Sequence, residues 1–91
     1  MKLRDIVPGN WVCLADKSLH RVLGNTAGVF DTCRVYQMPG RNPKEYRYKF
    51  EGMRQNMTNR IDSSFDIVAV FAESPIKNPN CKVLWARGKG K

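Results

Sequence analysis

The chain has 91 residues and a formal net charge of +8, and 42% of its residues are hydrophobic. This length predicts a single small domain, and the apolar fraction argues against disorder over most of it. No apolar run approaches the roughly 20 residues that span a bilayer, and no signal peptide is evident at the N-terminus. We therefore expect a cytoplasmic protein that makes no membrane contact.

The first third of the chain is predicted to form a hairpin. A Pro-Gly turn signal precedes a strand pattern over residues 10–15. A tight connection then leads to a second strand over residues 19–23, so the two are expected to pair. Residues 24–28 read as a loop, because they are rich in types that tolerate positive φ. A third strand is predicted over residues 33–38.

The segment 44–51 carries the strongest strand signal in the chain. Tyr46, Tyr48 and Phe50 alternate with charged residues, which places the three rings on one face of an extended strand. The preceding loop, residues 39–43, contains two prolines and a glycine, so this strand should pair antiparallel with the third. A domain this small needs large side chains inside, and we expect Phe50 and Tyr48 to belong to the core.

The remainder of the domain contains one ambiguous segment and two further strands. Residues 53–61 place apolar side chains at helical spacing, but their Asn and Thr residues weaken a helix, so a short strand or an irregular segment is equally expected. Asp62 begins a turn or caps a single helical turn. Residues 65–72 contain a nearly continuous β-branched run that favours a central strand, and residues 82–86 could add an edge strand.

These elements predict a mainly β fold for residues 1–86. Five or six short strands with frequent turns indicate a small antiparallel barrel or bent sheet, SH3-like or OB-like. Residues 87–91 are expected to be a flexible basic tail.

The positive charge is concentrated in two blocks. Residues 34–60 carry seven basic and two acidic side chains, and residues 74–91 carry five basic side chains and no acidic one. Clustered Lys and Arg attract polyanions, so the sequence predicts a nucleic-acid partner, DNA or RNA, bound electrostatically. The alternative is an ordinary basic protein whose charges are only solvated.

Aromatic side chains lie among these cations, as in surfaces that stack bases and hold phosphates. We predict nucleic-acid contacts from Arg34, Arg41, Lys44, Arg47, Lys49, Arg54, Arg87, Lys89 and Lys91. The candidate aromatic contacts are Tyr36, Tyr46 and Trp85. With the tyrosine face turned inward, Arg47 and Lys49 are expected to form an outward basic stripe with Arg34.

Catalytic chemistry has little support in the sequence. There is no nucleophile–base motif, phosphate-binding loop or dinucleotide fingerprint, so we expect a protein that is not an enzyme and needs no cofactor. Cys13, Cys33, Cys81 and His20 could in principle form one metal site, but they lack the close Cys pairs of zinc motifs. We expect no metal, and expect Cys13 and Cys33 to act as small core residues.

Two stretches carry a resemblance to known proteins. Residues 1–12, MKLRDIVPGNWV, resemble the opening of small SH3-like and KOW-like barrels, and residues 48–70 are similar to short accessory proteins of phages and prophages. The resemblance implies a phage or prophage origin and a binding role. It leaves open two alternatives to nucleic acid: a host protein with an acidic surface that the chain modulates, or a structural role in a virion.

Overall fold

A computed structural model describes residues 1–26 and 29–87, which form six β-strands and two short 3₁₀-helices. The strands are β1 (Trp11–Leu14), β2 (Leu19–Thr26), β3 (Val29–Tyr36), β4 (Lys44–Phe50), β5 (Ile67–Phe71) and β6 (Val83–Ala86). The helices are η1 (Leu3–Asp5) and η2 (Ser63–Phe65). The mainly β prediction is confirmed, and none of the helices in the described part of the chain is long and apolar enough to cross a membrane.

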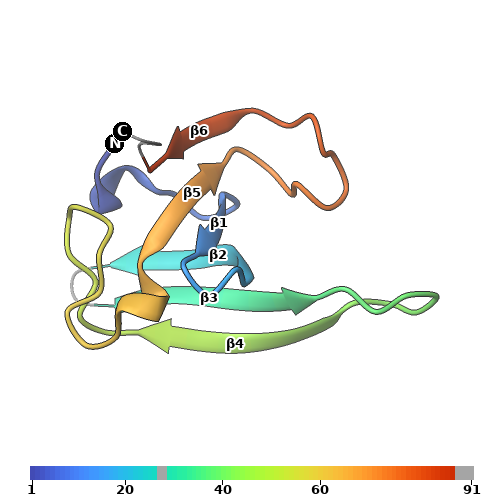
Figure 1. The fold of residues 1–91 in the computed structure, drawn as a ribbon, viewed down its shortest axis with the longest axis horizontal. Helices are drawn as coiled ribbons and strands as arrows, with labels where there is room; N and C mark the ends of the chain where they lie inside the picture. The colour runs from blue at the N-terminus through green and yellow to red at the C-terminus, as the bar shows by residue number, and fades with distance from the viewer. Residues whose placement is uncertain (27–28, 88–91) are drawn as a thin grey trace.

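All six strands belong to one antiparallel sheet in the order β4-β3-β2-β1-β5-β6. Figure 1 shows β5 and β6 running obliquely to β3 and β4, so the sheet is bent. Within the described residues β4 and β6 remain its two edges, and the closed-barrel alternative is wrong.

The predicted hairpins are present, but β2 is longer than expected. Residues 24–26, predicted to lie in a loop, pair with residues 29–31 of β3. Asn25 holds this stretch from the side, because its Nδ2 donates to the carbonyls of Leu3 (2.8 Å) and Ile6 (3.0 Å). Tertiary pairing thus overrides a weak local strand preference. Residues 27–28, the rest of the predicted loop, lie outside the described residues.

The core lies on one face of the bent sheet, which we call the inner face. Its fully buried side chains include Val12, Val22 and Val70 from three different strands. Leu3 and Ile6, in and after η1, and Met57 from the segment after β4 join them in the same cluster. Burial of this apolar surface is the main term that stabilises the sheet.

The ambiguous segment 53–61 is irregular. A single bridge joins Met53 to Asn59, and Met57 is fully buried with a φ of 74°. The capping prediction for Asp62 is confirmed: its Oδ1 accepts a hydrogen bond of 2.9 Å from the backbone N–H of Ser64 at the start of η2.

Arg87 belongs to the folded domain rather than to a free tail. Its backbone N–H donates to the carbonyl of Val68 (2.8 Å), and its Nη2 donates to the carbonyl of Ile67 (2.7 Å). The predicted tail therefore does not begin at Arg87. The rest of it, residues 88–91, lies outside the described residues.

Candidate nucleic-acid interface

One row of paired residues crosses the inner face on all six strands. From β6 to β4 it contains Trp85, Val70, Val12, His20, Arg34 and Tyr46. Residues paired across strands share a face of the sheet, so the row changes from apolar to cationic and aromatic as it leaves the core. Arg34 and Tyr46 therefore lie on the inner face at the β3–β4 side of the sheet.

The inner face of the β3–β4 hairpin shows the same gradient along the strands. The pair Phe30–Phe50 is buried, and in the next pair Thr32 is fully buried while Tyr48 is half-buried. The two pairs beyond them, Arg34–Tyr46 and Tyr36–Lys44, leave the core, and Tyr46 is 50% exposed. The prediction that Phe50 and Tyr48 pack in the core is confirmed.

Three adjoining hollows lie around this end of the hairpin, and we call them together the hairpin groove. The first, of about 360 Å³, is lined by Tyr36, Met38, Lys44, Tyr46 and Tyr48. The second is lined by Lys17, Ser18, Leu19, Arg34, Val35, Tyr36, Gln37 and Ile76. The third, of about 560 Å³, is lined by Gln37, Met38, Pro39, Arg41, Pro43, Ile76 and Lys77. The three adjoin one another, because Tyr36, Met38, Gln37 and Ile76 each line two of them.

The lining of the hairpin groove has one sign of charge. It contains the cations Lys17, Arg34, Arg41, Lys44 and Lys77, and among its described lining residues there is no Asp or Glu. Two carboxylates outside the lining act on these cations: Glu45, whose pKa is lowered mainly by Arg21 and slightly by Lys77, and Asp16, whose pKa is also lowered. Burial raises the pKa of Asp16, but hydrogen bonds from Ser18 and the charge of Arg34 outweigh it. A concave surface with cations of this density favours a polyanion.

The aromatic part of the groove is ordered by ring–ring and ring–cation contacts. The guanidinium carbon of Arg34 lies 4.4 Å from the centroid of the Tyr36 ring. The rings of Tyr36 and Tyr46 are 5.5 Å apart and nearly perpendicular, at 82°. The hydroxyl of Tyr48, and to a smaller extent burial, raises the pKa of Tyr36, so this ring is a neutral phenol at neutral pH. Cation–π and edge-to-face contacts thus hold the groove's rings in place.

The His20 ring packs against Tyr48 on the core side of the hairpin groove. The ring is buried, with Nε2 2.9 Å from Ser18 Oγ and Nδ1 2.9 Å from Thr32 Oγ1. It lies edge-on to Tyr48 at 5.6 Å. Burial first, and then the nearby charge of Arg34, lowers the pKa of His20 to about 4. His20 is therefore a neutral structural residue at neutral pH, and among the described residues no His, Cys, Asp and Glu cluster could hold a metal.

The predicted basic stripe is not present, because its arginines lie on opposite faces of β3 and β4. Arg47 pairs across the strands with Cys33, whereas Arg34 pairs with Tyr46, so the two arginines lie on opposite faces. Arg47 is also occupied, because its Nη2 forms an ion pair of 2.7 Å with Asp31 Oδ2. The stripe that was to join Arg34 with Arg47 and Lys49 is wrong, because cross-strand register separates them.

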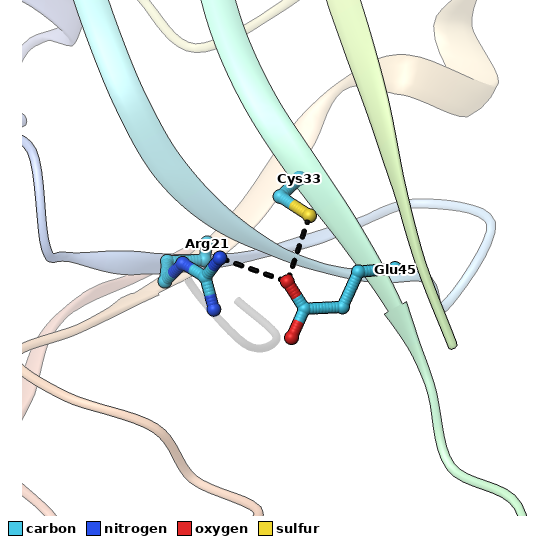
Figure 2. Close-up of polar contacts among 3 residues, drawn as sticks. All are labelled: Arg21, Cys33 and Glu45. Atoms are coloured by element: carbon cyan, nitrogen blue, oxygen red, sulfur yellow. Dashed lines mark hydrogen bonds and ion pairs between the residues drawn. The ribbon is translucent and has the colours of Figure 1, made fainter. Parts of the chain in front are cut away.

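A second ion pair lies on this opposite face. Arg21 Nη2 is 2.8 Å from Glu45 Oε1, and the same oxygen accepts a hydrogen bond of 3.3 Å from the Cys33 thiol (Figure 2). Burial, and then Glu45, raises the pKa of Cys33. Charges of both signs are paired on this face, in contrast to the hairpin groove.

The other predicted contact residues are dispersed. The guanidinium of Arg54 lies 3.4 Å from Thr58 Oγ1, in the segment that follows the far end of β4. Trp85 packs against the core, and Arg87 lies over its ring at 5.4 Å. Lys49 is exposed and shares its face of β4 with Arg47. Lys89 and Lys91 lie outside the described residues.

The structure therefore brings together Arg34, Arg41, Lys44, Tyr36 and Tyr46 from the predicted set. It adds two cations that the sequence did not single out, Lys17 from the β1–β2 turn and Lys77 from the β5–β6 connection. Both come from segments distant in the chain, and only their positive charge could have pointed to them.

Comparisons with protein-family models, with curated proteins and with solved structures find no match to this chain.

Proposed function

We propose that the protein is a non-enzymatic binding module that holds nucleic acid in the hairpin groove. The observation that carries this proposal is the composition of the groove: five cations and three tyrosines, with no acidic residue among its described lining residues. The opposite face of the same strands pairs its charges internally, so the groove is the better surface for a polyanion.

Phosphate contacts from these cations would make the affinity depend on salt. For single strands, each phosphate neutralised lowers the slope of log K against log salt concentration by about 0.7. Engagement of all five groove cations would therefore give a slope of roughly −3 to −4. Contacts of this kind position the nucleic acid but read little sequence.

The test is the fluorescence anisotropy of labelled oligonucleotides, measured at several salt concentrations. Lys44→Ala and Arg41→Ala should each weaken binding and make the salt slope shallower by about one contact. Lys49→Ala is the matched control, because it removes the same charge from the opposite face of the same strand. A flat salt response, or an equal loss in the Lys49 variant, would contradict this placement.

An acidic surface of another protein could complement the same cations. The resemblance of residues 1–12 and 48–70 to SH3-like and KOW-like barrels and to phage accessory proteins supports a binding role of either kind. Co-purification from the native host after nuclease treatment separates the two. Loss of all partners supports nucleic acid, whereas one stable protein partner supports the alternative, and co-purification with virions supports an assembly role.

A further inference from the structure

Resting on the proposed function, we propose that the hairpin groove selects unpaired, single-stranded nucleic acid by stacking a base on Tyr46. The cations of the groove could serve single strands and duplexes alike. The exposed ring of Tyr46 distinguishes between them, because a base can stack on it only when that base is separated from its neighbours.

Tyr46 is the most accessible ring of the groove. It is 50% exposed, although it belongs to a paired strand whose next two inner-face positions, Tyr48 and Phe50, turn into the core. Arg34 occupies one side of Tyr36, and the Tyr36 ring stands nearly perpendicular to that of Tyr46. A base therefore cannot lie parallel to both rings at once, and the exposed surface of Tyr46 is the natural platform for one base.

The spacing of Tyr46 and Tyr48 differs from the spacing of stacked bases. Tyr46 and Tyr48 are two residues apart on one face of β4, a separation of about 6.8 Å along the strand. Neighbouring bases in a duplex rise by only about 3.4 Å. The ring spacing therefore does not match that of stacked bases, and Tyr48 packs against the core, so Tyr46 offers its exposed ring to a single base. A single strand can present such a base, whereas a duplex resists it.

The cations of the groove lie where they could contact the phosphates beside a base stacked on Tyr46. Lys44 lines the same hollow as Tyr46, and Arg34 is the cross-strand partner of Tyr46. A base on Tyr46 thus has a cation within reach for its flanking phosphates. The loop that closes the β3–β4 hairpin projects beyond the rest of the molecule in Figure 1, where a flexible strand could pass along it.

The experiment compares a fluorescent oligothymidylate, an oligouridylate of the same length, and a duplex with the same number of phosphates, all at low salt. The single strands should bind more tightly than the duplex. Tyr46→Ala should weaken single-strand binding about 5- to 150-fold, which corresponds to the ~1–3 kcal/mol of one stacked base. Tyr46→Phe keeps the ring and should bind nearly as tightly as the original chain.

The salt slope separates stacking from phosphate contact. Tyr46→Ala should leave the slope unchanged, whereas Lys44→Ala should make it shallower. Because the Tyr46 side chain is half exposed, an unchanged thermal midpoint will show that the variant is folded. The oligothymidylate and oligouridylate arms show whether DNA or RNA is preferred, and either preference supports the proposal.

Equal affinity for the duplex and the single strands, or unchanged affinity in Tyr46→Ala, would overturn the single-strand inference. The proposed function would still stand if Lys44→Ala weakened binding and made the salt slope shallower. No binding of any probe at low salt would instead overturn the proposed function and the inference with it.

Discussion

His20 Nδ1 lies 2.9 Å from Thr32 Oγ1, and the two side chains are buried together on the inner face of β2 and β3. Burial and the charge of Arg34 lower the pKa of His20 from 6.5 to about 4. The unfolded chain therefore binds a proton more readily than the folded one between these values, so stability is full above about pH 6.5 and falls as the pH drops toward 4. The loss attributable to His20 is roughly 3 kcal/mol at most.

Urea unfolding at a series of pH values measures this loss, and an NMR titration of the chain's single histidine measures its pKa directly. Asp16 and Asp62 have pKa values below their ordinary 3.8, so protonation of these carboxyls reduces the stability of the fold only at lower pH. A histidine that titrates near 6.5 in the folded protein would contradict the prediction.

Arg87→Ala should destabilise the fold by about 1–3 kcal/mol, because it removes a charged donor from the carbonyls of Ile67 and Met57. The measurement is urea unfolding with a shared m-value. Lys82→Ala, which removes a positive charge from an exposed position just before β6, should change stability by less than about 0.5 kcal/mol. Equal effects of the two changes would mean that charge, rather than the carbonyl contacts, is responsible.

Gly52→Ala should destabilise the protein more than Gly40→Ala. Both glycines have positive φ, 81° and 70°, so both changes carry the conformational cost of about 1–2 kcal/mol. At Gly52 the new Cβ would also lie 3.0 Å from Arg60 Cγ and 3.1 Å from Ile61 side-chain carbons, whereas Gly40 has open space. Thermal unfolding of the two variants compares them, and identical losses would show that Arg60 and Ile61 move aside freely.

Cys33 should react with a thiol reagent more slowly than Cys81. Its side chain is only 4% exposed, and burial together with the neighbouring Glu45 raises its pKa, so little thiolate forms at neutral pH (Figure 2). Glu45→Gln should speed the labelling of Cys33, because it removes the negative charge beside the sulfur. Glu51→Gln, at the other end of β4, is the matched control.

Mass spectrometry of partially labelled protein resolves the three cysteines, all of which are free thiols. Labelling of Cys33 as fast as that of Cys81, or no response to Glu45→Gln, would contradict the assignment of Cys33 as a buried, protonated thiol.

Local patterns in the sequence determined the positions of most strands and turns. The alternation in residues 44–51 specified β4 and which of its residues share a face, because side chains alternate along any strand. The cap at Asp62 was equally local, since it depends only on the next two residues. The charge blocks pointed to a polyanionic partner but not to the surface that would bind it.

Only the tertiary structure shows which of these residues lie together in the candidate site. Register placed Arg34 with Tyr46 and Arg47 with Cys33, and so divided one predicted stripe between two faces. The bend of the sheet buried Phe50 and left Tyr46 half exposed, although both lie on one face of the same strand. Lys17 and Lys77 joined the groove from turns far away in the chain. The reason is physical: alternation is a property of each strand alone, whereas register, curvature and loop placement depend on contacts between distant segments.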